Sequence, residues 1–371
     1  MEPYRQTYCR IDLDILDRNL QNLKDTLDGL PIMLVLKGDA LGHGAPMLFR
    51  HFLGQGHTSF AVAACNEAME LRALDDKAEI LIFGWTPDGL LPTAAENRLM
   101  PSICEYRQAK LLSELGLHAK IQIMVDTGMH RLGFPVTEEA ADTVAAIAKL
   151  PSLEIAGVYS HLAQLDHEHD LLQKAEFDRF LALCEARGVT FPCRHLANGK
   201  NAMKYPELRY DLTRVGTIWE GFCSYAPEMV EAPMSLHSQV AQVRTLPAGA
   251  GFGYGLAGAA DHERRIATLC FGYADGVPKS LDSGVGFVGI RGKKAPLVGG
   301  MCMDMCFADV TDIPDAQPGD TVDIYGGDGM DYYTARELTG IGLTDLQVKI
   351  TRRVPRVYVE NRKIVAVKEL N

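Results

Sequence analysis

The sequence has few of the features that mark a membrane, secreted or nucleic-acid-binding protein. No apolar run approaches the roughly 20 residues of a membrane span. The N-terminal stretch MEPYRQTYCRIDLD has no apolar core, so we expect no signal peptide. The net charge is −11 over 371 residues, which leaves no basic stripe for a phosphate backbone. We therefore expect a soluble, cytoplasmic protein that binds neither membranes nor nucleic acids.

Cysteine also lacks a diagnostic pattern. The nine cysteines are odd in number, run from Cys9 to Cys306 and contain no CxxC pair. Reduced, mostly structural thiols in the cytosol are the simplest interpretation. We expect His167 and His169, in an acidic run, to lie on a solvated loop. A metal site needs converging ligands, so we expect none here.

The pattern of apolar and turn-forming residues changes near residue 235. Before it, short apolar runs alternate with helical patterns, which predicts a parallel α/β fold. The count is compatible with a (β/α)8 barrel of the TIM type, but spacing does not separate a barrel from an open doubly wound sheet. The strand-like runs include IMLVLK, FAVAA (60–64), EILIFG (79–84), KIQIMV (120–125) and LEIAGVYS (153–160), and helical patterns cover roughly 66–74, 105–116, 137–149 and 170–187.

After this point, strand-length runs are separated by Gly, Pro and Asp, as in VGFVGIRG, CFADVTD and DTVDIYGG. This pattern predicts a β-rich second domain. We therefore assign residues 10–235 to an α/β domain and residues 236–371 to a β-rich domain, and we expect residues 1–9 to pair with the latter.

The segment VLKGDALGHG places Lys37 at the end of a buried apolar strand, directly before a Gly-rich loop. Desolvation lowers the pKa of a lysine, and such a lysine can attach to a carbonyl group. The carboxyl end of a barrel strand is also where active-site residues lie. A lysine that merely reaches solvent from a strand end fits this segment equally well.

Two further strand ends carry charged or titratable side chains. MVDTGMHRLGF holds Arg131, whose fork of donors can bind a carboxylate or phenolate, although the segment alone is more typical of a surface turn with a structural Asp126–Arg131 pair. His161 ends the run LEIAGVYS. A lone histidine there is more often structural than catalytic.

Later loops offer weaker signals. RHLANGKN and LTRVGTIWEG contain His195, Arg214 and the pair Gly216–Thr217, whose backbone amides could cradle a phosphate. FGYADGVPK sets Tyr273 between two glycines. A phenol has a pKa near 10 and needs a neighbouring cation or histidine to act as a base. GGMCMDM holds Asp304, which we expect to be buried.

Taken in order, these segments resemble the alanine racemase family, a group of enzymes that depend on pyridoxal phosphate. The resemblance covers nearly the whole chain. Its most specific feature is GYADG far downstream of K-x-D-A-x-G-H-G. The segments that carry it are VLKGDALGHG, FAVAACNEAMELR, VDTGMHRLG, SHLAQLD, HLAN, TRVG, GYGLAG, GYADG, GGMCMDM and RRVPRVY.

The resemblance implies an N-terminal (β/α)8 barrel, a C-terminal β domain and a head-to-tail homodimer with shared active sites. Lys37 would carry the cofactor and act as the base on one face of Cα, and Tyr273 of the partner subunit would act on the other face. Arg214 would face the pyridine nitrogen with His195 behind it. His161 would couple the tyrosine to this arginine.

The remaining roles concern the substrate and the phosphate. Arg131 would contact the cofactor's phenolate oxygen and the substrate carboxylate. Met303 of the partner subunit would offer its backbone N–H to that carboxylate. Gly216 and Thr217 would bind the phosphate.

Several positions depart from the family pattern. Leu41 and Gly199 replace a tyrosine and a serine, Met124 replaces a lysine that is carbamylated in some members, and Gly300 replaces an arginine. Thr344 replaces a tyrosine near the phosphate and the substrate. Hydroxyls of Thr217 and Thr344, or Lys200, would then partly replace the lost phosphate donors. A smaller, more polar residue 344 also predicts tolerance for serine or another substrate larger than alanine.

Other functions remain open on the same barrel. A decarboxylase or aldolase dependent on pyridoxal phosphate would share the lysine but not GYADG. A non-catalytic carrier of pyridoxal phosphate would resemble the barrel alone. A scaffold protein would keep the fold and bind no cofactor.

Overall fold

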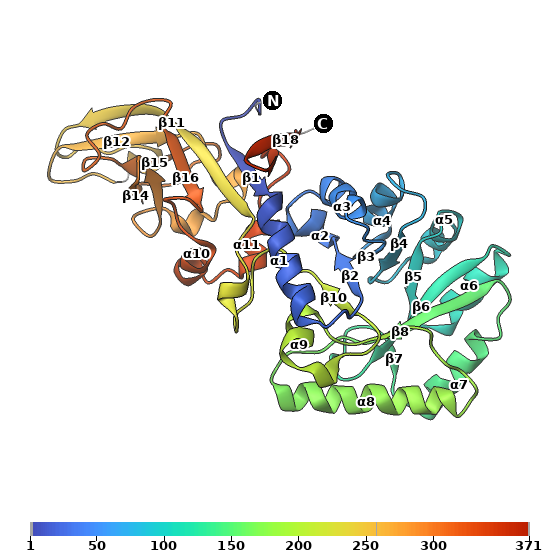
Figure 1. Ribbon diagram of the computed structural model, residues 1–371. Coiled ribbons are helices and arrows are strands. Elements are labelled where there is room, and N and C mark those ends of the chain that lie inside the picture. Colours follow the sequence, from blue (N-terminus) through green and yellow to red (C-terminus); the bar gives the residue numbers. More distant parts are fainter. Residues whose placement is uncertain (1–2, 257, 370–371) are drawn as a thin grey trace. The chain divides into compact units, whose positions relative to one another are not determined.

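The computed structural model describes residues 3–256 and 258–369, and the chain divides into two compact units (Figure 1). We call the first the barrel unit; it comprises Leu20–Ala40 and Ala45–Trp219. The second, the strand-rich unit, comprises Met1–Asn19, Leu41–Gly44 and Glu220–Asn371. The domain division expected at residue 235 stays a prediction.

Within the described residues, the barrel unit contains eight parallel strands in one nearly closed sheet. They are β2 (Ile32–Val35), β3 (Ser59–Val62), β4 (Glu79–Ile82), β5 (Met100–Ile103), β6 (Ala119–Asp126), β8 (Leu153–Tyr159), β9 (Arg194–His195) and β10 (Thr213–Val215). Their order is β10-β2-β3-β4-β5-β6-β8-β9, and the short β7 (Phe134–Pro135) pairs with β6. A parallel bridge from Asn198 to Arg214 links the region after β9 to β10. The (β/α)8 barrel is thereby confirmed, and the alternative of an open doubly wound sheet is excluded.

Helices lie between these strands, as the alternating pattern predicted. They are α1 (Leu13–Thr26), which begins in the strand-rich unit, and α2 (Lys37–Leu41), α3 (Ala45–Gly54), α4 (Cys65–Arg72), α5 (Leu91–Glu96), α6 (Tyr106–Glu114), α7 (Glu138–Ile147), α8 (His167–Glu185) and α9 (Gly199–Lys204). The expectation that His167 and His169 lie on a loop is wrong, because both residues lie in the first turn of α8. Asp166 caps this helix by accepting from the backbone N–H of His169 at 2.9 Å.

Apolar residues predominate in most of the barrel strands, because both faces of such a strand are covered. Their inward side chains form one core cluster: Met33, Val35, Ala61, Leu81, Met100, Met124 and Tyr159. Met124 is only 5% exposed in this cluster. The position where the resemblance would place a lysine is therefore part of the apolar core here.

The strand-rich unit is built on a second sheet, with the order β12-β15-β14-β13-β16-β11-β1-β17-β18. Its strands are β1 (Tyr8–Asp12), β11 (Met234–Leu246), β12 (Arg264–Leu269), β13 (Phe287–Ile290), β14 (Lys293–Val298), β15 (Cys306–Asp309), β16 (Thr321–Tyr325), β17 (Arg356–Glu360) and β18 (Lys363–Lys368). Two helices accompany them, α10 (Tyr332–Thr339) and α11 (Leu343–Val348). The N-terminal β1 runs antiparallel to β11 and parallel to β17, so the start of the chain is part of this sheet.

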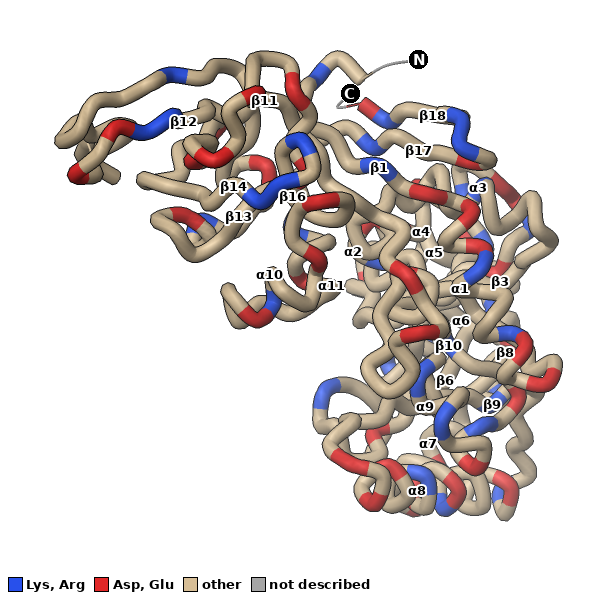
Figure 2. Tube along the Cα trace, turned by 60° about the vertical axis from the view of Figure 1, so that its left-hand side comes forward, with Lys and Arg blue, Asp and Glu red and all other residues tan. Residues whose placement is uncertain are grey.

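Acidic and basic residues are interspersed along the chain, for example along α8 (Figure 2). Such mixing is typical of a solvated surface. Among the helices of the described residues, none combines the length and the apolarity that a membrane crossing requires.

Candidate functional site

The predicted residues of the barrel unit gather at the carboxyl ends of its strands. Lys37 follows β2, and Gly216 directly follows β10. These two strands are parallel neighbours, with Val215 paired to Leu34, so both segments leave the sheet at the same end. His161 likewise follows β8, which neighbours β9. This end of a parallel barrel is where active sites form.

Arg214 is the centre of the polar network at this end. It lies on β10, is only 4% exposed, and donates to the carbonyls of Ser160 at 2.9 Å and Leu196 at 2.7 Å. Its Nη1 lies 2.6 Å from Nδ1 of His195, and its Nη2 lies 3.2 Å from Nδ1 of His161. Among the described residues, its hydrogen-bond partners are neutral acceptors and include no carboxylate. The barrel unit thus buries a cation without an anionic partner.

The two histidines beside Arg214 are neutral. Because a guanidinium only donates, Nδ1 of His195 must accept, and its proton lies on Nε2, 2.6 Å from Oε1 of Gln122. Burial, followed by the charge of Arg214, lowers the pKa of His195 well below its ordinary value. The same two causes lower the pKa of His161 to about 3. Burial lowers the pKa of Arg214 to about 10, so it keeps its charge at neutral pH.

Tyr159 supports this network from inside the barrel. Its ring stacks on His195 with centroids 4.9 Å apart and planes 3° apart. Its hydroxyl lies 2.7 Å from Oγ of Ser102, and burial raises its pKa to about 12, so the phenol stays protonated. Sequence reasoning missed Tyr159, Ser102 and Gln122. Gln122 had a usable signal, because a polar residue inside an apolar strand needs a buried partner.

Lys37 begins a strained turn. Residues 38–41 all have φ between 52° and 65°, a left-handed conformation that costs non-glycine residues about 1–2 kcal/mol each. Glu67 holds this turn to the next strand end, since Oε1 accepts from the N–H of Gly38 at 2.6 Å and Oε2 from that of Ala63 at 2.8 Å. Such strain is typical of functional sites. Lys37 itself is exposed, so this chain does not supply the burial expected for it.

Arg131 is exposed on the loop after β6. The structural Asp126–Arg131 pair considered from the sequence does not form. Asp126 instead accepts from the N–H groups of Gly128 at 3.0 Å and His130 at 2.9 Å, and its Oδ2 lies 3.2 Å from the His130 ring. Within the described residues, no hydrogen bond or ion pair engages the Arg131 guanidinium, but its charge contributes to the low pKa of His161. Arg131 is therefore free to bind an incoming anion.

Tyr273 and Met303 lie together in the strand-rich unit. Tyr273 begins the 3-10 turn η5 (Tyr273–Asp275), and its N–H donates to the carbonyl of Cys302 at 3.2 Å. The next residue, Ala274, donates to the carbonyl of Met303 at 3.0 Å. Both predicted side chains are exposed, at 41% and 52%. Nζ of Lys279 lies 5.8 Å from the centre of the tyrosine ring and supplies a neighbouring cation.

Two expectations about this unit change. Asp304, expected to be buried, has a side chain that is 59% exposed and pairs with Arg353. Thr344 lies in α11 and donates its hydroxyl to the carboxylate of Glu220, which is fully buried. In this structure the hydroxyl that was expected to replace a phosphate donor is thus engaged by an acidic residue.

Comparisons with known proteins cover both units. A family model described as "Alanine racemase, N-terminal domain" matches residues 11–222, and one described as "Alanine racemase, C-terminal domain" matches residues 233–358. The alanine racemase of Clostridium tetani is 36% identical over 98% of both chains. That of Methanococcus maripaludis is 32% identical over 95% of this chain and 98% of its own.

Solved structures agree over the same span. Alanine racemase of Clostridium difficile 630 superposes with a TM-score of 0.95 at 28% identity over 99% of both chains. The alanine racemase of Bacillus anthracis with bound L-Ala-P gives a TM-score of 0.91 at 28% identity, covering 100% of this chain and 99% of its own.

Proposed function

Because the chain belongs to the alanine racemase family and is an enzyme of that type, we propose that it interconverts the enantiomers of a small amino acid, alanine by family default, with pyridoxal phosphate as cofactor. The observation that carries the cofactor proposal is the buried, uncompensated charge of Arg214 at the carboxyl end of the barrel. A buried cation is costly unless something electron-rich meets it. A pyridine nitrogen and an anionic phosphate are groups of that kind.

The residues present fit pyridoxal phosphate. Lys37 supplies an amine for attachment, and Gly216 and Thr217 supply a backbone turn after the neighbouring strand for the phosphate. Arg214 can only donate, so it would face an unprotonated ring nitrogen, and His195 and Gln122 hold it in place. When bound, the cofactor withdraws electrons from Cα and makes the α-hydrogen acidic.

The protein then moves the proton. Inversion at Cα needs two acid–base groups on opposite faces, and we assign these to the Lys37 amine and to the phenol of Tyr273 of the partner subunit. His161 couples this phenol to Arg214 through its neutral imidazole. Exposure of Tyr273 and Met303 in the single chain supports a homodimer, since both must meet another surface to work.

The substrate is oriented through its carboxylate. Arg131 offers two parallel N–H donors from the loop after β6, and its guanidinium is uncommitted among the described residues. The backbone N–H of Met303 from the partner subunit adds a third donor. With the carboxylate held at this point, the α-hydrogen is directed to one base or the other.

Turnover of both enantiomers of a panel of amino acids tests this function, with chiral analysis of the products. We expect interconversion of alanine, a visible absorbance band of bound cofactor, and the loss of both in Lys37→Ala. Release of carbon dioxide or of an aldehyde would instead support a decarboxylase or an aldolase. A cofactor band without any turnover would support a carrier, and absence of both a scaffold.

We further propose tolerance for serine or a larger substrate. Thr344 is smaller than the family's tyrosine, and its hydroxyl and the Glu220 carboxylate make this position polar. Thr344→Tyr should lower the rate with serine relative to that with alanine, and an unchanged ratio would contradict the proposal. Thr217→Val should weaken cofactor binding if this hydroxyl contacts the phosphate, which the dissociation constant of pyridoxal phosphate measures. The cytoplasmic location stays a prediction.

A further inference from the structure

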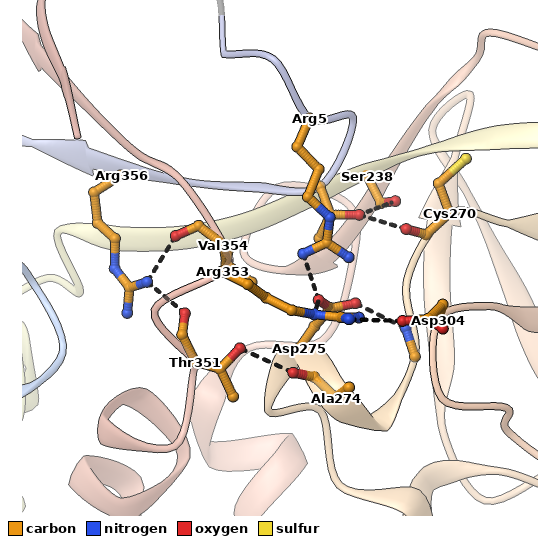
Figure 3. Close-up of polar contacts among 12 residues, drawn as sticks. Arg5, Ser238, Cys270, Ala274, Asp275, Asp304, Thr351, Arg353, Val354 and Arg356 are labelled. Carbon is orange, nitrogen blue, oxygen red and sulfur yellow. Dashed lines mark hydrogen bonds and ion pairs between the residues drawn. The ribbon is translucent and has the colours of Figure 1, made fainter. Parts of the chain in front are cut away.

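The strand-rich unit buries one carboxylate directly beside the tyrosine turn (Figure 3). Asp275 is 0% exposed and is the last residue of the turn that begins with Tyr273. Its Oδ2 accepts from the N–H of Gly272 at 2.9 Å. Its Oδ1 lies 2.5 Å from Nη1 of Arg5 and 2.7 Å from Nε of Arg353. Two cations from opposite ends of the chain therefore meet one anion.

Of these two cations, Arg353 also contacts the loop that carries Met303. Nη1 of Arg353 donates to Oδ1 of Asp304 at 2.6 Å, one residue after Met303. Thr351 adds two hydrogen bonds. Its N–H donates to the carbonyl of Asp275 at 3.2 Å, and its hydroxyl donates to the carbonyl of Ala274 at 2.9 Å. Both loops that bear the proposed active-site groups are thus tied to one segment.

The backbone around this turn has no spare room. A Cβ at Gly272 would lie 2.4 Å from the carbonyl oxygens of Cys302 and Met303. Gly276 has φ of 96°, and a Cβ there would lie 2.1 Å from the carbonyl oxygen of Lys349. The turn is therefore packed directly against the neighbouring backbone, and its position depends on what holds those segments together.

We propose that Arg5, Asp275, Arg353 and Asp304 form a positioning network for the second base. The network fixes the Tyr273 turn and the Met303 loop in one relation, so that the phenol and the Met303 amide face the same reacting centre. This inference rests on the proposed function. Arginine suits the task because its planar fork binds two carboxylates in set directions. We assign them as positioning residues because they hold the two loops through contacts with one another.

Asp304→Asn is the sharpest test, because Asp304 is the exposed end of the network and its loss leaves the buried ion pairs intact. Exchange of the α-hydrogen with solvent is measured for each enantiomer of alanine separately. In Tyr273→Phe, one enantiomer loses this exchange and thereby reveals which one the phenol serves. We expect Asp304→Asn to slow that exchange about tenfold, a fraction of the roughly 10²-fold that a 1 Å misplacement costs. Exchange of the other enantiomer should change less than twofold.

The matched control is Asp142→Asn in the barrel unit. Asp142 is 67% exposed and lies 2.5 Å from Nε of Arg187, which resembles the Asp304–Arg353 pair. It should leave both exchange reactions unchanged. Arg353→Lys, which keeps the charge but loses the fork, should produce the same asymmetry as Asp304→Asn, more strongly.

A readout without substrate completes the test. Amide hydrogen exchange of residues 272–276 and 300–305 should accelerate in Asp304→Asn and not in Asp142→Asn. If the wild-type enzyme exchanges neither enantiomer, the proposed function itself fails. If the wild type exchanges both and Asp304→Asn slows them equally or not at all, the positioning role alone is overturned.

Discussion

The two units each build a network around a buried charge, but they balance that charge in opposite ways. In the barrel unit Arg214 is held by neutral histidines and carbonyls. In the strand-rich unit Asp275 is met by two arginines. The positive charge of Arg214 in the barrel unit therefore remains uncompensated, whereas the negative charge of Asp275 in the strand-rich unit is neutralised by its neighbours.

This difference separates two kinds of work. A preorganised, uncompensated cation can stabilise an electron-rich group that arrives later, because its dipoles and donors are already oriented. A compensated ion pair offers nothing to a ligand, but it ties segments together in one geometry. We therefore expect substitutions in the first network to reduce both stability and cofactor binding, and those in the second to reduce stability and alignment while cofactor binding remains.

The largest effect should come from removal of the barrel cation. Arg214→Gln leaves several buried carbonyls without a donor, at about 1–3 kcal/mol each, so the free energy of unfolding should fall by about 4 kcal/mol. The absorbance band of bound cofactor should also be lost. Arg187→Gln, at a surface ion pair of the same unit, should cost less than about 1 kcal/mol. Denaturant unfolding of the two variants measures these losses, and equal losses would contradict the cost assigned to the buried cation.

A smaller but still large effect should follow from removal of the buried anion. Asp275→Asn keeps the side-chain shape but leaves Arg5 and Arg353 facing a neutral amide, which should cost about 3 kcal/mol. The cofactor band should remain, because the barrel network is unchanged. Absorbance and denaturant unfolding check the two parts, and loss of the band would show that the two networks do not work separately.

The smallest effect concerns pH. The pKa of His161 is about 3 in the folded chain against an ordinary 6.5, so the unfolded chain binds a proton that the folded chain does not. Its contribution to stability is full above pH 6.5 and is lost as the pH falls toward 3. His161→Gln should therefore reduce the slope of stability between about pH 6 and 4.5 by about 1 kcal/mol per pH unit. Unfolding free energies across this range test it, and an unaltered slope would contradict an imidazole that folding keeps neutral.

Much of the barrel was predictable from local pattern. Alternating apolar runs located β2, β3, β4, β6 and β8, and helical periods located α4, α6, α7 and α8. The pattern failed for β9 and β10, which are two and three residues long, and for β5, where Pro101 and Ser102 interrupt the apolar run. Ser102 is tolerated there because its hydroxyl donates to the carbonyl of Ile82 at 2.6 Å. Because Ile82 lies on another strand, the sequence around Ser102 does not indicate this hydrogen bond.

The candidate site was likewise predictable where local sequence determines it and unpredictable where contacts between distant segments do. Motif order and strand ends pointed to Lys37, Arg131 and His161 because a parallel barrel presents its strand ends at one face. The strained turn after Lys37 and its support by Glu67 were not foreseeable. They depend on a contact between two separate strand ends, which no spacing within one segment reveals.

Composition, periodicity and the order of motifs were sufficient to establish the class of fold, the family and the chemistry-bearing residue types. The pairing of charges was decided by tertiary structure alone. Asp275 and Arg353 are 78 residues apart, and their ion pair forms because folding removes both from water and leaves each as the other's nearest counter-charge. The partners of Arg214 were also decided by folding, because the surrounding strands placed carbonyls and imidazoles, and not carboxylates, around it.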